Sequence, residues 1–132
     1  MPAEAPDDSG AVLVEFALVV PFLIMLVLAV VQFGLVLNRQ QGLHAAAREG
    51  ARVASFPDAT RTDIEGQVDG ALSGVALDSG YTVSLEPDTN TPCSGRSGQM
   101  VTVTIATTSA LDVPFLTNQT INMEGKGSFR CE

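Results

Sequence analysis

The sequence contains few of the residues on which catalysis and nucleic-acid binding depend. His44 is its single histidine, and no Ser or Cys stands near it in the chain to serve as an activated nucleophile. The sequence has seven Lys and Arg against fifteen Asp and Glu, which gives a net charge of -8, and the basic residues form no patch. These shortages argue against an enzyme and against a nucleic-acid partner.

Phosphate-binding loops and metal-loop spacings are missing as well. Gly66, Gly70 and Gly74 recur inside a helical pattern, where they do not form a glycine-rich phosphate loop. The oxygen-bearing residues after that pattern lack any calcium-loop spacing; they are Asp78, Glu86, Asp88 and Asn90. The sequence therefore predicts no metal site and no cofactor.

Only two cysteines are present, Cys93 and Cys131, and both lie in the polar C-terminal half. They lack the close pairing that zinc sites use, so a disulfide is the favoured interpretation and two separate buried thiols are the alternative. If this half lies outside the cytoplasm, closing the loop contributes roughly 3–4 kcal/mol in the chain-entropy model.

One long apolar run dominates the N-terminal third. No charged residue occurs between Glu15 and Arg39, and the segment from Phe16 to Leu37 is almost entirely apolar. As a helix it would be roughly 33 Å long, which matches the hydrocarbon core of a bilayer. The run therefore predicts a transmembrane helix.

The residues before this run do not form a secretory signal peptide. Residues 1–10 contain Glu4, Asp7 and Asp8 but no Lys or Arg. The apolar run is too long for a signal peptide, and no small-residue cleavage site follows it at 38–41. A processing site is expected instead in front of the run.

The junction between Gly10 and Ala11 carries that expectation. A polar leader ending in glycine, four apolar residues and then Glu15 resemble the signal of type IV and Flp-type pilins, which a prepilin peptidase cuts after the glycine. The resemblance implies that Glu15 pairs with the new amino group of Ala11, one helical turn away or in a neighbouring subunit. The alternative is a helix-entry Glu held at the headgroup level by the helix dipole.

Three further motifs extend the resemblance over about residues 10–55. They are AVLVEFALVVP at 11–21, QFG at 32–34 and AAAREGARVA at 45–54, of which the REGAR piece at 48–52 is the most specific. Together they resemble the TadE family of tight-adherence (Tad) pilus proteins. The resemblance implies a pseudopilin in the bacterial inner membrane, with the prepilin peptidase, other pilin subunits and the Tad machinery as partners.

The charges beside the apolar run and the other features of the sequence favour opposite orientations in the membrane. The leader is acidic, and Arg39, Arg48 and Arg52 follow the run, so the positive-inside rule alone would place the C-terminal part in the cytoplasm. The cysteines and a cytoplasmic processing site favour the opposite. We expect a single-pass protein with an extracytoplasmic C-terminal domain.

The helix is expected to continue from Ala11 to about Ser55, with Pro21 as a local kink. A stripe of small side chains follows one of its faces and fits either subunit packing or packing on the protein's own domain. Arg48 and Arg52 fit either contacts with another subunit's carboxylates or a solvated face. The stripe comprises Gly42, Ala46, Gly50 and Ala54.

The C-terminal half predicts one helix on a small sheet. Thr62 and Glu65 suggest a capping box at the start of a helix that ends at about Ala76. The glycines of this helix would let it pack closely on the sheet. Period-two patterns predict strands at 81–85 and 100–108 and an interrupted third strand through 120–123 and 129–131, while 111–116 is an apolar loop. The expected fold class is α+β, divided into a leader (1–10), an assembly helix (11–56) and an α+β domain (57–132).

Overall fold

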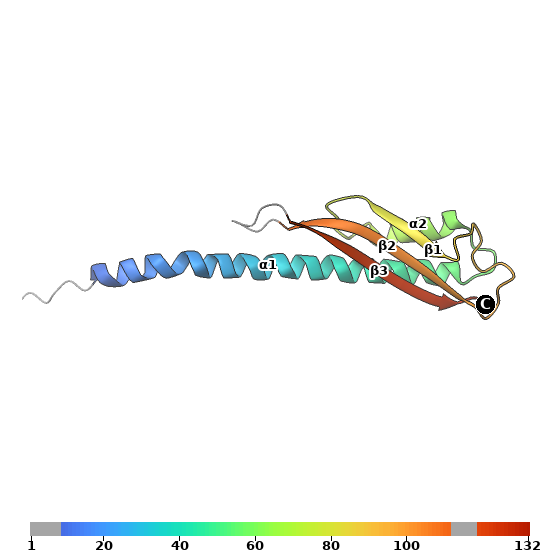
Figure 1. The fold of residues 1–132 in the computed structure, drawn as a ribbon, viewed down its shortest axis with the longest axis horizontal. Helices are drawn as coiled ribbons and strands as arrows, with labels where there is room; N and C mark the ends of the chain where they lie inside the picture. The colour runs from blue at the N-terminus through green and yellow to red at the C-terminus, as the bar shows by residue number, and fades with distance from the viewer. Residues whose placement is uncertain (1–8, 112–118) are drawn as a thin grey trace, which may run out of the picture.

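The apolar run and the polar residues after it form a single helix. The computed structural model describes residues 9–111 and 119–132, and the helix α1 spans Ser9–Ala54 within them. Figure 1 shows it running straight out of a small globular unit. Helix α2 (Arg61–Leu72) and the strands β1 (Tyr81–Glu86), β2 (Met100–Leu111) and β3 (Gln119–Arg130) complete the fold. The α+β prediction is confirmed.

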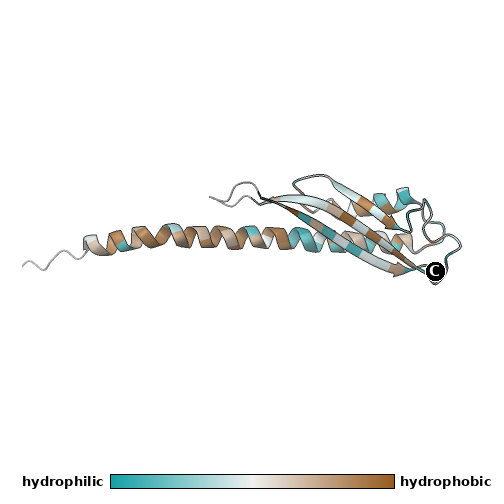
Figure 2. Ribbon diagram, in the orientation of Figure 1, coloured by the Kyte–Doolittle hydropathy of each residue, from teal (hydrophilic) through white to brown (hydrophobic). Residues whose placement is uncertain are grey.

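The N-terminal half of α1 touches nothing else in the described part of the chain. Every residue from Ala11 to Val31 is exposed except the half-buried Val20, and the helix continues through Pro21 without interruption. Figure 2 shows this half as almost uniformly hydrophobic. By length and composition α1 can cross a membrane, and none of its most apolar window is buried. About 69 Å of helix follows from 46 residues.

Helix α2 begins two residues earlier than its sequence pattern indicated. Thr60 is the N-cap: its hydroxyl accepts from the Asp63 amide at 3.3 Å, and the Asp63 carboxylate accepts from the Thr60 amide at 2.9 Å. The predicted capping box of Thr62 and Glu65 is therefore wrong. Thr60 wins because its extended backbone leaves its side chain free to turn back onto the first turn.

The same helix also ends earlier than expected, at Leu72 instead of about Ala76. The amides of Ser73 and Val75 bond carbonyls three residues back, at 3.4 and 2.9 Å, so the chain tightens into turns. Gly74 favours this end because glycine is a poor helix former.

The three strands form an antiparallel sheet in the order β1-β2-β3. The third strand is continuous, so the predicted interruption is wrong: Gly125 and Gly127 pair in register with Ile105 and Val103. The sequence pattern failed there because these glycines occupy the inward positions where an apolar side chain was expected.

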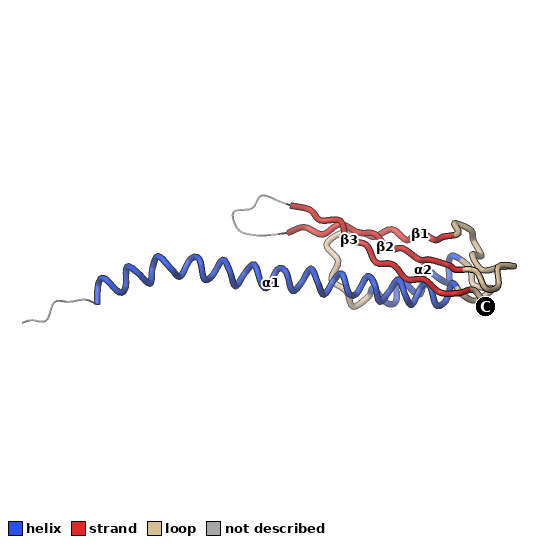
Figure 3. The backbone as a smooth tube through the Cα atoms, turned by 60° about the horizontal axis from the view of Figure 1, so that its bottom comes forward, coloured by secondary structure: helices blue, strands red, loops and turns tan. Residues whose placement is uncertain are grey.

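The core lies between this sheet and the C-terminal half of α1, with α2 beside it (Figure 3). The second half of α1 thus belongs to the globular unit, and the first half projects from it. The fully buried side chains of the core come from all three layers; they are Leu43, Ala46, Ala47, Ala51, Ala54, Ile64, Val68, Val101, Val103 and Ile105.

A disulfide joins Cys93 to Cys131, as the sequence predicted, with their Cα atoms 5.4 Å apart. Both cysteines are buried. Beside the disulfide, the Cys131 amide donates to the Gln99 carbonyl at 2.7 Å, and the Glu132 amide donates to the Ser55 carbonyl at 3.0 Å. The end of the chain is therefore fastened both to the preceding loop and to the end of α1.

Candidate functional site

The predicted processing and pairing residues lie at the bare end of α1. Gly10 is exposed, and a side chain built on it would meet nothing within 4 Å. Glu15 is exposed one turn beyond Ala11, and it has no hydrogen bond or ion pair with any described residue. No described side chain pairs with this carboxylate, so its pairing with a new Ala11 amino group, in its own chain or in a neighbouring subunit, stays a prediction.

A polar cluster that the sequence did not predict holds the helix where it enters the globular unit. Arg39 contacts Asp78 at 2.5 Å and donates to the Ser109 hydroxyl at 2.7 Å, and Ser109 in turn donates to Asp78 at 2.7 Å. Ser109 is only 1% exposed. The hydrogen bond from Ser109, together with the Arg39 charge, holds the pKa of the Asp78 carboxyl below its ordinary value.

This cluster fixes the direction of α1 relative to the sheet directly after the apolar run. Its signal in the sequence was Arg39, the first charged residue after that run. The partners could not be read from the sequence because they lie 39 and 70 residues further along the chain.

The small-residue stripe of α1 packs inside its own chain, which is the second of its two interpretations. A Cβ on Gly42 would lie 2.6 Å from Val75, and one on Gly50 would lie 2.7 Å from Val68. Ala46 and Ala54, the other two members of the stripe, are fully buried. The stripe lets α2 approach α1 closely. In this conformation it is covered, so a role in contacts between subunits remains only a prediction for these residues.

A second close approach, also not predicted, brings β3 against α1. A Cβ on Gly125 would collide with the backbone of Leu43 and His44, and one on Gly127 with the backbone of Ala47 and Arg48. Their signal was the alternation of two glycines at inward positions of a strand.

His44 takes part in this same contact. Its Nδ1 accepts the Lys126 amide at 3.3 Å, and its Nε2 lies 3.2 Å from the Gln40 amide nitrogen. The lone histidine thus joins helix to strand.

Arg48 and Arg52 lie on the uncovered face of α1. Arg52 pairs with Glu49 at 2.8 Å, and this hydrogen bond lowers the pKa of the exposed Glu49 carboxyl. Arg48 is exposed and makes no ion pair or hydrogen bond with any residue that the structure describes. The structure brings no carboxylate of its own domain to it.

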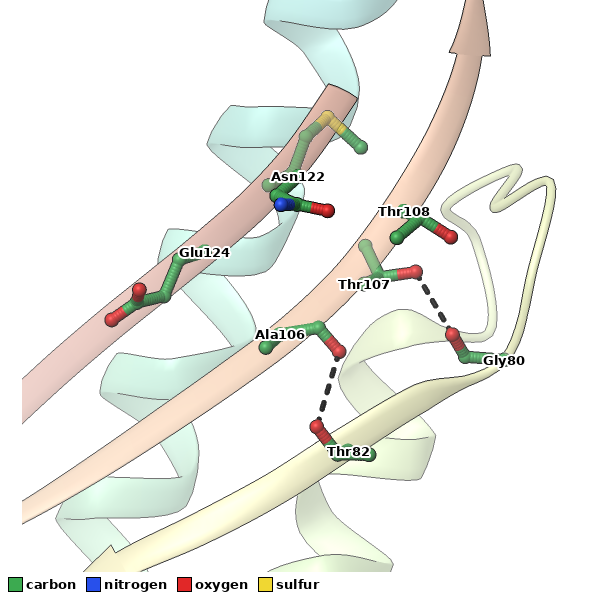
Figure 4. A pocket seen from close by; sticks show the side chains of 8 residues that line it. Gly80, Thr82, Ala106, Thr107, Thr108, Asn122 and Glu124 are labelled. Carbon is green, nitrogen blue, oxygen red and sulfur yellow. Dashed lines mark hydrogen bonds between the residues drawn. The ribbon is translucent and has the colours of Figure 1, made fainter. Parts of the chain in front are cut away.

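The described residues offer no constellation for acid–base or metal chemistry. No group of three His, Cys, Asp or Glu side chains among them could hold a metal ion. A hollow of about 370 Å³ lies around Ala106 on the outer face of the sheet, and Glu124 is the single titratable side chain that lines it. Figure 4 shows how the lining side chains lie. The remaining lining is hydroxyl, amide, thioether and backbone, from residues Gly80, Thr82, Thr107, Thr108, Asn122 and Met123.

Comparison with known families finds one match. The model of the family described as TadE-like protein matches residues 10–52. No curated protein and no solved structure matches the chain. The matched segment covers the bare half of α1, most of the small-residue stripe and both uncovered arginines, and it ends before the rest of the globular unit. A TadE-like segment suggests a role in Tad pilus assembly.

Proposed function

We propose that this protein is a pseudopilin or minor pilin of the Tad pilus assembly apparatus, anchored by α1 in the bacterial inner membrane. One observation carries the proposal: the TadE-like residues 10–52 form one unbroken helix, bare in its apolar half and built into a domain in its other half. Such a helix can exchange lipid for the helices of neighbouring subunits without unfolding the domain, because no core residue of the domain lies in the bare half.

Processing by a prepilin peptidase between Gly10 and Ala11 is part of this proposal. The cut would create an amino group one turn from Glu15, and a carboxylate in an apolar helix is costly until such a partner is present. The exposed position of Glu15 supports a partner from a neighbouring subunit as well as from its own chain.

The C-terminal domain is proposed to lie outside the cytoplasm. The buried Cys93–Cys131 disulfide supports this side, since structural disulfides persist in oxidising compartments.

Intact mass and N-terminal sequencing of the membrane-extracted protein test the proposal, in cells with and without the prepilin peptidase. The expected mature chain begins at Ala11 when the peptidase is present. Gly10→Val should abolish cleavage, and Gly34→Val is the matched control, because a side chain at either glycine meets nothing within 4 Å. A chain that still begins at Met1 in peptidase-active cells would instead indicate an unprocessed single-pass anchor whose domain binds an envelope partner.

Deletion of the protein tests the role in assembly. Cells without it are expected to lose surface pili, and the wild-type chain should restore them while the uncleaved Gly10→Val chain should not. Normal piliation of the deletion strain would count against a required assembly role.

A further inference from the structure

The uncovered face of α1 carries two arginines that point away from α2. Gly50 faces α2, and Arg48 and Arg52 each lie two residues from it, which is a rotation of about 200° around the helix. Gln41 and Ala45 are exposed on the same side. The face therefore presents two cations one turn apart: Arg52 is paired with Glu49 of the same helix, and Arg48 has no ion pair with any described residue.

The opposite flank of the domain carries two carboxylates with the same spacing. Glu65 and Asp69 lie one turn apart on α2 and are exposed. With Tyr81 and Val83 of β1 they line a hollow of about 290 Å³. Asp69 has no ion pair or hydrogen bond with any residue in the described ranges, and Glu65 has only Arg61 at 3.9 Å.

These two faces lie toward opposite edges of the sheet. Helix α1 packs on β3 and β2, whereas the hollow with the carboxylates lies at β1, the opposite edge of the sheet. A single copy therefore cannot bring its own arginines to its own carboxylates, but two neighbouring copies can.

The two pairs also lie at the same height along the molecule. Gly50 lies against Val68 of α2 and Gly42 against Val75, just after the end of α2, so the chain from α2 to Val75 runs antiparallel to α1. Gly50 and Val68 lie at the same height, so residues equally far before Gly50 and after Val68 are level. Arg48 is then level with Asp69 to within about one residue, or 1.5 Å. Arg52 is level with Glu65 to the same precision. Two copies that stand parallel in one membrane would thus bring cation to carboxylate without an axial shift.

The glycines beside the carboxylates leave room for such a neighbour. A Cβ on Gly66 or Gly70 would meet nothing within 4 Å, so packing within the chain does not require either glycine, although each weakens the helix relative to alanine. The uncovered face of α1 in a second copy carries the small side chain of Ala45 between Gln41 and Arg48. Small residues on both sides permit a close helix-to-helix approach.

We infer that copies of this chain associate side by side in the membrane, with Arg48 and Arg52 of one copy on Asp69 and Glu65 of the next. The inference rests on the proposed function only in that all copies share one membrane and one orientation. Because the two faces differ, the contact is heterologous and repeats from copy to copy as a row or a ring.

Co-purification of two differently tagged full-length copies, co-expressed and extracted in mild detergent, tests the inference. Arg48→Glu/Arg52→Glu and Glu65→Arg/Asp69→Arg should each lower self-capture about tenfold, the scale expected for reversing two exposed pairs. Mixing these two variants, or combining all four substitutions in one chain, should restore capture to near the wild-type level. Raised salt should weaken wild-type capture, because exposed ion pairs are screened.

Lys126→Glu/Arg130→Glu is the matched control, because it makes the same charge change on the outer face of the sheet. Equal losses in this control, failure of the four-fold swap to restore capture, or unaltered capture in the single-face variants would each overturn the inference. The outcome is separable from the proposed function. An uncleaved N-terminus together with restored capture would reject processing and leave the side-by-side contact standing.

Discussion

The close approach of β3 to α1 leads to a sharp prediction for Gly127→Ala. The added Cβ would lie closer than 3.0 Å to three backbone atoms of Ala47 and Arg48, and no side chain there can swing away. Since carbon atoms pack at about 3.5–4.0 Å, the strand would have to move by roughly 1 Å from the helix. Overpacking of this kind costs about 2–3 kcal/mol, which lowers the folding equilibrium constant between about 30-fold and about 150-fold.

Denaturant titration of the full chain in detergent micelles measures this loss. The chain has no Trp and one Tyr, and the half-buried Tyr81 packs against the core, so tyrosine fluorescence reports on the domain while the apolar helix stays folded in the micelle. Gly66→Ala is the control, because its Cβ meets nothing within 4 Å and should raise stability by up to about 1 kcal/mol. A Gly127→Ala chain within about 0.5 kcal/mol of wild type would refute the argument.

Three further outcomes are expected. Replacing Cys93 and Cys131 by Ser should cost about 4 kcal/mol in the same titration, the chain-entropy value for a separation of 38 residues, and a loss below about 1 kcal/mol would contradict it. Because the pKa of Asp78 is lowered in the fold, its carboxylate stabilises the domain above the ordinary Asp pKa of about 3.9, and this contribution disappears as pH falls through the lowered value. Asp78→Asn should therefore flatten the acid side of the plot of unfolding free energy against pH, and Arg39→Ala should flatten part of it. An unchanged plot in Asp78→Asn would show that this cluster is not a source of the pH dependence. Glu15→Ala should block pilus assembly while insertion and cleavage at the leader proceed, as seen by fractionation and intact mass, and normal piliation would contradict the pairing role.

The parts of the fold that depend on local pattern could be predicted from the sequence. The uninterrupted apolar run and the period-two alternation of residues 100–108 each report on their own neighbourhood, and the cysteines could be paired because the sequence has only two. They predicted α1, the long central strand and the disulfide. The small-residue stripe could be recognised as a packing face. The sequence could not show whether α2 or a second subunit packs on it, because both require small side chains there.

Apart from the disulfide, contacts between distant segments could not be predicted from the sequence. Ser109 became the buried partner of Arg39 only when the sheet placed it beside the neck of the helix. Gly125 and Gly127 weaken the strand pattern in the sequence, but their missing side chains allow the backbone of α1 to pack directly on β3. The capping residue was misassigned because Thr60 and Thr62 both precede a suitable acid by three residues, and backbone conformation decides between them.

The contact of β3 with α1 also determines how the molecule would bear a mechanical load. Leu43 opposes Gly125 and Ala47 opposes Gly127, so strand and helix run in the same direction along the contact. Tension drawn through α1 toward the membrane acts along this contact and loads its interactions in shear, all together, instead of peeling them apart one by one. At the far end the Cys93–Cys131 crosslink prevents β3 from sliding out of the sheet. In the proposed function, a subunit pulled by its membrane helix would pass the force into its domain without the domain being stripped from the helix.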